Sequence, residues 1–162
     1  NKKQKQITFI KGVSNFPDVS EFPGQVSNEI EKKYLVVFDD CLNEISKPNI
    51  KKIEDYFKLG RKRGITLTFL GQRYYDVSKF VRAQLSYTLI ANMGMKDAVA
   101  ILKDSGADMS KEKLMKIFKY ATRKESDKDM PFMKICNINC PAGEKFARNF
   151  TDFIDVNDPM FN

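Results

Sequence analysis

Two adjacent carboxylates, Asp39 and Asp40, directly follow an apolar run over residues 34–38. A continuous apolar run predicts a strand buried on both faces, as in a parallel sheet covered by helices. The two carboxylates would then lie at the carboxyl end of that strand, where ligands bind in open α/β sheets. Like charges repel and need a nearby cation or good solvation. A hydrated Mg²⁺ held by one carboxylate would meet that need, as in a Walker B motif. The alternative is an acidic turn with Asp40 in solvent.

Two further polar residues accompany the next predicted strand, residues 65–70. Gln72 follows that strand, and Arg61 precedes it in the segment 60–64, Gly-Arg-Lys-Arg-Gly. A nucleotide hydrolase needs a metal-organising acid, an activating carboxylate, a polar group near the γ-phosphate and a cation for developing charge. Asp39 suits the metal role, and Asp40 could accept a proton from the attacking water.

Gln72 could orient that water or sense the γ-phosphate, and Arg61 could pair with phosphate oxygens through its planar guanidinium. Each residue also has a simpler explanation. Gln72 could cap the following turn, and Arg61 could solvate a helix end.

The elements that would position these residues alternate between strand and helix patterns. Such alternation with short links predicts an α/β fold with a mostly parallel sheet. Pro48 is expected to lie at the start of the helix between the first two core strands, and Gly60 or Gly64 near its end. The expected strands are 6–11, 34–38, 65–70, 87–91 and 132–138, and the expected helices are 26–33, 48–59, 77–84 capped by Asp76, 96–103, 111–124 capped by Ser110, and a tail stripe with Phe146, Phe150, Phe153 and Ile154.

The composition restricts the class of protein. The 162 residues suit one domain or a large piece of one. Their net charge of +7 favours an anionic partner such as nucleic acid, with a lysine-rich solvated surface as the alternative. No apolar run approaches the roughly 20 residues that span a bilayer, and no signal-type segment is visible, so we expect an intracellular, non-secreted protein.

Cysteine and histidine usage argues against zinc and histidine chemistry. The chain has no His and only three Cys, namely Cys41, Cys136 and Cys140. Because three cysteines cannot all pair and no second ligand pair accompanies Cys136 and Cys140, we expect free thiols in a reducing compartment.

The order of the motifs resembles that of one known group of ATPases. The set comprises Gly60-Arg61-x-x-Gly64-Ile65, a strand, Gln72-Arg73, Asp76-Val77 and Val81-Arg82-Ala83-Gln84. It is similar over about residues 35–101 to the FtsK–HerA superfamily of DNA-translocating ATPases. Within that superfamily, the chain looks most like the poxvirus and giant-virus DNA-packaging ATPases, and Arg148-Asn149-Phe150 resembles their late arginine-aromatic stretch.

The resemblance implies a RecA-like P-loop NTPase core, bound ATP and Mg, and a homo-oligomeric ring around double-stranded DNA. Asp39 would hold the metal through water, Asp40 would be catalytic, and both would contact the nucleotide together with Gln72. Arg61 would act across a subunit interface, with Arg82 behind it. Capsid proteins are further candidate partners, and the expected location is the host cytoplasm, viral factory or virion.

The chain departs from that family at one essential motif. It contains no Gly-x-x-x-x-Gly-Lys-Ser/Thr loop, the backbone cradle for the β- and γ-phosphates. Asp40 also stands where many relatives carry Glu, Gln84 replaces Asn, and Tyr74 replaces the Pro of bacterial members.

We therefore expect residues 1–162 to be a single partial ATPase domain that lacks the N-terminal Walker A portion and is inactive alone. Its parts would be 1–33 before Walker B, 34–105 from Walker B to the sensor, and 106–162 with the C-terminal helices and final strand.

Three functional hypotheses follow. The first is an ATP-driven motor module for packaging or translocating double-stranded DNA, complete only with a P-loop portion. The second is a non-catalytic relative without a P-loop that binds DNA or the ring. The third is a small basic α/β protein that binds nucleic acid and is unrelated to ATPases.

Overall fold

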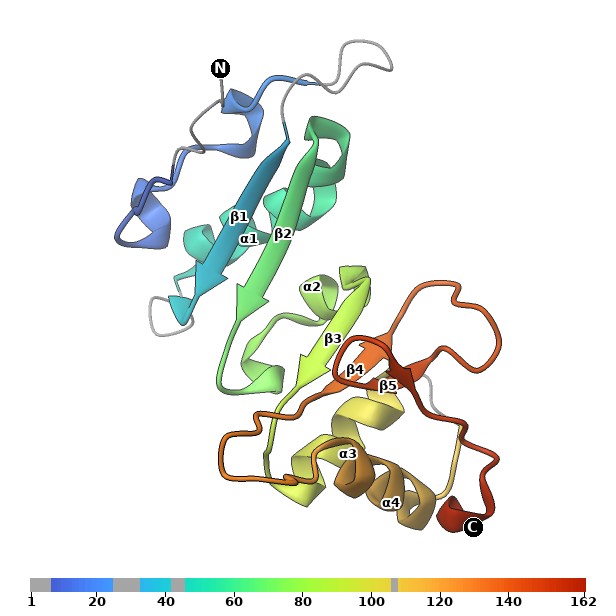
Figure 1. Ribbon diagram of the computed structural model, residues 1–162. Coiled ribbons are helices and arrows are strands. Elements are labelled where there is room, and N and C mark those ends of the chain that lie inside the picture. Colours follow the sequence, from blue (N-terminus) through green and yellow to red (C-terminus); the bar gives the residue numbers. More distant parts are fainter. Residues whose placement is uncertain (1–6, 25–32, 42–45, 106–107) are drawn as a thin grey trace, which may run out of the picture. The chain divides into compact units, whose positions relative to one another are not determined.

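The computed structural model describes residues 7–24, 33–41, 46–105 and 108–162, and Figure 1 shows their secondary structure. The fold is mixed α/β, as expected. Contacts within the chain divide it into two units, Asn1–Gln84 and Leu85–Asn162. Each unit is described by itself below.

The first unit is built on a parallel strand pair. β1 (Tyr34–Asp39) and β2 (Ile65–Leu70) pair in register from Tyr34 opposite Ile65 to Asp39 opposite Leu70. They are connected by α1 (Lys47–Leu59) and the 3-10 turn η4 (Gly60–Arg63). This strand–helix–strand unit confirms the predicted elements on either side of Pro48.

Local signals explain where α1 and η4 begin and end. The Ser46 hydroxyl accepts a hydrogen bond from the Asn49 amide at 3.4 Å, and Pro48 occupies the first turn of α1. The left-handed residue is Gly64, with φ of 66°, whereas Gly60 is right-handed and continues from α1 into η4. Glycine adopts the left-handed conformation without a steric penalty, so Gly64 can turn the chain into β2.

The core of this unit lies between the strand pair and α1. Val36 and Phe38 are buried with Ile53 and Tyr56 of the helix. The residues of the alternate strand face are open: Leu35 is 67% and Val37 is 46% exposed. The expectation that this strand is buried on both faces is therefore wrong for the part of the chain that the structure describes, because only the α1 side is covered there.

The segment before β1 is irregular. Residues 7–11 form no strand, which corrects the predicted strand over 6–11, and Phe9 is 93% exposed. The short turns η1 (Val13–Asn15) and η2 (Val19–Glu21) follow. Phe16 and Phe22 pack their rings against Tyr56 and so tie this irregular segment to α1. The predicted helix 26–33 falls almost entirely outside the described residues.

A turn and a short helix complete the first unit. η5 (Tyr74–Asp76) leads into α2 (Lys79–Gln84). Ser78 rather than Asp76 caps this helix, since its hydroxyl accepts from the Val81 amide at 3.3 Å and donates to Glu54 Oε1 at 2.7 Å. The predicted cap was wrong because Asp76 is the last residue of η5, and Val77 and Ser78 lie between it and the helix.

The second unit contains an antiparallel sheet and two helices. The sheet runs in the order β3 (Tyr87–Ile90), β4 (Met133–Cys136), β5 (Phe146–Arg148) and β6 (Asp152–Phe153). α3 (Met95–Asp104) packs with α4 (Lys111–Ala121), whose cap is Ser110 as predicted, and a final turn η6 covers Pro159–Phe161. Figure 1 shows these elements in yellow to red.

This sheet corrects two expectations. β3 pairs antiparallel with β4, Tyr87 opposite Cys136, so among the described strands the parallel arrangement is limited to β1 and β2. The tail stripe is not helical, because Asn149 has φ of 56° and turns the chain between β5 and β6. Of the four tail residues, Phe146 and Ile154 are buried, whereas Phe150 and Phe153 are exposed.

The cysteines correct a third expectation. Cys136 and Cys140 form a disulfide, with Cα atoms 6.5 Å apart, whereas Cys41 is a thiol, as expected. The loop after β4 folds back on itself and brings these two residues within bonding range, which their spacing alone does not reveal. No helix among the described residues has the length and apolar character needed to cross a membrane.

Candidate active site

The carboxyl ends of β1 and β2 bring two of the predicted site residues together. The Gln72 side chain donates from Nε2 to Asp40 Oδ2 at 3.3 Å, and the Asp40 amide donates to the Leu70 carbonyl at 3.1 Å. Asp39, the last residue of β1, is exposed beside them. The parallel pairing is what places Gln72 next to Asp40, since both strands end at the same edge.

Asp40 adopts an unusual backbone conformation at this edge. Its φ of 46° lies in the left-handed region, which costs most L-residues free energy and which Asp and Asn tolerate best. The Cys41 thiol donates to the Asp39 carbonyl at 3.3 Å and helps to define the turn. A strained residue at a strand end, with its carboxylate in contact with an amide, is typical of a functional position.

The donor set at this edge fits a magnesium ion. Mg²⁺ binds through one or two carboxylates and keeps several water ligands, so it needs no cage of protein ligands. Asp39 and Asp40 supply two exposed carboxylates, and Gln72 contacts one of them. Among the described residues, no group of three or more acidic or cysteine side chains forms a denser metal site.

Arg61 lies at the opposite end of the strands. It belongs to η4, whose following residue Gly64 accepts a hydrogen bond from the Tyr34 amide at the start of β1. Six strand residues at about 3.3 Å each separate that end from Asp40, a distance of roughly 17–20 Å. The structure therefore does not bring Arg61 to the acidic pair of the same chain.

Arg82 is held by two tyrosines. Its guanidinium carbon lies 4.9 Å from the ring centres of both Tyr74 and Tyr75. These cation–π contacts join α2 to the turn that begins after Gln72. These contacts were not predicted, because nothing in the spacing of Tyr74 and Tyr75 indicates that a residue of the next helix packs on both rings.

Two other cations of this unit serve the scaffold. Lys52 donates to the Phe16 carbonyl and pairs with Asp18 at 3.3 Å, and Arg63 donates to the Phe22 carbonyl. Beside them the Tyr56 hydroxyl donates to the Pro17 carbonyl at 2.8 Å. Burial raises the pKa of Tyr56 well above its usual value, and the charges of Glu21 and Asp18 raise it further. These contacts fasten the irregular segment 13–22 to α1 and η4.

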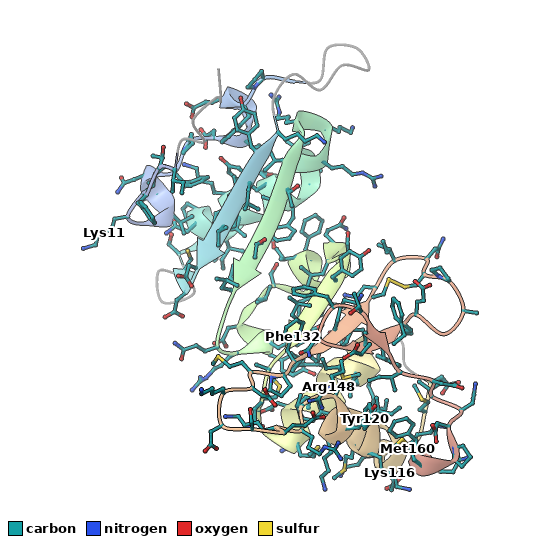
Figure 2. All side chains as sticks on the ribbon, viewed as in Figure 1. Lys11, Lys116, Tyr120, Phe132, Arg148 and Met160 are labelled. Atoms are coloured by element: carbon teal, nitrogen blue, oxygen red, sulfur yellow. A yellow bond between two sulfur atoms is a disulfide. The ribbon has the colours of Figure 1, made fainter. Side chains whose placement is uncertain are left out.

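The arginine-aromatic stretch of the second unit is also anchored. Arg148 bonds to the Tyr120 carbonyl at 3.1 Å and pairs with Glu125 at 3.3 Å, and Figure 2 shows Arg148 close to Tyr120. Phe150 packs on Phe132, with ring centres 4.9 Å apart. A polar hollow of about 320 Å³ lies beside Arg148. Within it, hydrogen bonds from the Ser126 side chain and the Glu125 amide lower the pKa of Asp129.

The fold and this edge define a mixed α/β protein with an acidic pair and an amide at the carboxyl end of parallel strands. The chain belongs to the family described as poxvirus A32 protein, whose sequence model matches residues 15–142, about four fifths of its length. The match includes every candidate site residue. It supports the relation to viral DNA-packaging ATPases that the motif order implied, while membership of the wider FtsK–HerA superfamily remains a prediction. No curated protein and no solved structure matches the chain significantly.

Proposed function

We propose that this chain is the module of a viral double-stranded DNA packaging or translocation motor that carries the Walker B acids and the polar sensor. It would hydrolyse ATP with Mg when joined to a P-loop portion. The observation that supports the proposal is the contact between Asp40 and Gln72 at the carboxyl ends of β1 and β2, in a member of a DNA-packaging ATPase family.

The acidic pair and the amide have distinct proposed roles. Asp39 would hold Mg²⁺ through water, and the bound ion would neutralise charge on the phosphates. Asp40 would accept a proton from the attacking water, and Gln72 would orient that water or sense the γ-phosphate. The 3.3 Å hydrogen bond between Gln72 and Asp40 keeps the two side chains adjacent. A water molecule or phosphate oxygen that contacts one of them would therefore also lie close to the other.

Arg61 would act on the nucleotide of a neighbouring subunit. It is exposed and lies at the far end of the strands, so a role within its own subunit's site does not fit the geometry. A homo-oligomeric ring would place it beside the next ATP, where a guanidinium stabilises developing charge. Arg82 is a second candidate for this role, and its contacts with Tyr74 and Tyr75 would keep its guanidinium in one orientation.

The second candidate function is a non-catalytic relative that binds DNA or the ring. It differs from the first candidate in needing no Gly-x-x-x-x-Gly-Lys-Ser/Thr loop, a motif that residues 1–162 do not contain. Without this loop, the chain offers no backbone cradle or lysine for the β- and γ-phosphates.

The test compares Mg-dependent ATP hydrolysis by this chain alone with hydrolysis by the chain joined to a P-loop portion, each with and without double-stranded DNA. The proposal predicts background hydrolysis for the chain alone and turnover for the joined protein. Robust turnover by the chain alone would contradict the missing-loop argument. A joined protein that binds nucleotide but does not hydrolyse it would favour the non-catalytic relative.

A further inference from the structure

Positive charge is unevenly distributed between the two units. Among described residues, the first unit carries twelve Lys and Arg against seven Asp and Glu, and the second carries twelve against eleven. The excess that makes this chain basic therefore lies mostly in the first unit. An anionic partner would be attracted mainly to that unit.

Some cations of the first unit are unavailable to a partner. Lys52 and Arg63 are half-buried and donate to carbonyl groups of the segment 13–22. Nine others are exposed. Four of these nine are lysines of α1 and η4 whose side chains form no hydrogen bond or ion pair with any described residue: Lys47, Lys51, Lys58 and Lys62. We call these four residues the lysine stripe.

The lysine stripe follows the outer side of α1. Lys47, Lys51 and Lys58 recur at intervals of four and seven residues, which places them on one face of a helix. Ile53 and Tyr56 are buried on the opposite face of α1, and Lys62 follows four residues after Lys58, in η4. From Lys47 to Lys58 the stripe is about 16 Å long at 1.5 Å per residue.

We propose that the lysine stripe binds the phosphate backbone of double-stranded DNA. This inference rests on the proposed function for its choice of partner, and it adds the surface that meets the DNA. A duplex carries one charge per about 1.7 Å of axis, so 16 Å of helix faces roughly nine phosphates. Flexible lysines suit such contacts, which require charge but no fixed geometry and carry no sequence information.

The other lysine-rich helix, α4, offers a poorer surface. Lys113 and Lys116 bond to Asn162, and Figure 2 shows Lys116 beside the C-terminal turn that carries Met160. Arg123 pairs with Glu125 at 3.6 Å. These contacts commit two lysines of α4 and the nearby Arg123 to the second unit itself. The remaining exposed lysines in and around α3 and α4 provide a matched control.

The experiment measures binding of a short fluorescent DNA duplex by anisotropy over a range of NaCl concentrations. The stripe variant combines K47Q, K51Q, K58Q and K62Q, and the control variant combines K103Q, K111Q, K119Q and K124Q. Both remove four charges from exposed positions, and Gln has a helix propensity close to that of Lys. Arg61 is left unchanged so that its proposed role in hydrolysis is not tested at the same time.

The inference predicts that the stripe variant binds the duplex at least about tenfold more weakly than the wild type. The salt slope, meaning the decrease of log K with log[NaCl], should become smaller by about 3.6, or 0.9 for each lost contact. The control should stay within about twofold of the wild type. Circular dichroism checks that the variants are folded. If the fourfold variant is unfolded, the double variant K58Q/K62Q replaces it, and its salt slope should change by about half as much.

Two results would overturn the inference in different ways. Equal weakening in the stripe and control variants would show that total charge rather than this surface binds DNA, and the motor proposal would stand. Wild-type protein that shows no salt-dependent binding of the duplex would remove both the stripe and the DNA partner of the proposed function.

Discussion

At the scale of single residues, Asp40 has the most specific requirements. Its left-handed φ of 46° restricts the residues that fit there, and its carboxylate accepts a hydrogen bond from Gln72. Asn tolerates the same backbone conformation. Asp40→Asn therefore removes the negative charge while keeping the turn, which separates chemistry from folding at this position.

Tyr56 gives a test of how the irregular segment 13–22 is fastened. Tyr56→Phe removes the hydrogen bond to the Pro17 carbonyl and should lower the free energy of unfolding by about 1 kcal/mol. Urea unfolding measures this change. Tyr87→Phe is the control, because Tyr87 is 53% exposed. Equal stability of the Tyr56 variant and the wild type would contradict the assigned role.

The difference in stability between the wild type and Tyr56→Phe should depend on pH. Because burial and the acidic neighbours raise the folded-state pKa of Tyr56, its contribution is complete below the ordinary tyrosine value of 10.0. The contribution is lost as pH rises above that value towards the folded-state pKa. The stability advantage of the wild type over Tyr56→Phe should therefore shrink in alkaline solution and stay constant at neutral pH.

At the scale of elements, the strands and helix around Pro48 could be predicted because their signals are local. Pro48, the β-branched run 65–70 and Gly64 each act within a few residues. The pairing of β3 could not be predicted, since its partner β4 lies more than 40 residues later in the sequence. The prediction of a helix in the tail was wrong for another reason: the spacing of its aromatic residues fits a helix as well as the observed hairpin.

Gly64 should be required for the turn between η4 and β2. Gly64→Ala adds a Cβ atom to a residue with φ of 66°, a conformation that is strained for alanine. The substitution should lower the free energy of unfolding by roughly 1–2 kcal/mol. Gly24→Ala is the matched control, because an added Cβ there meets no atom within 4 Å. Thermal unfolding measures both. A Gly64 variant as stable as the control would show that the turn tolerates other conformations.

At the scale of the whole molecule, only part of the candidate site could be predicted from the sequence. The proximity of Asp40 and Gln72 follows from two parallel strands that end at one edge, and the structure has that contact. Other features depend on tertiary contacts between segments that are distant from one another or lie in different elements. Arg82 packs on the ring of Tyr74, and Lys52 and Arg63 donate hydrogen bonds to carbonyl groups of the segment 13–22. Motif order alone could not distinguish these cations from those available to a partner.

The most direct test of the central claim is Mg-dependent ATP turnover by the chain joined to a P-loop portion, with substitutions at the end of β1. Asp39→Ala and Asp40→Asn should each abolish turnover, whereas Arg61→Ala should abolish it while largely keeping nucleotide affinity. Asp55→Asn, which removes a carboxylate from α1, is the control and should leave turnover unchanged. Normal Mg-dependent hydrolysis by the Asp39 and Asp40 variants would contradict the assignment of this edge as the active site.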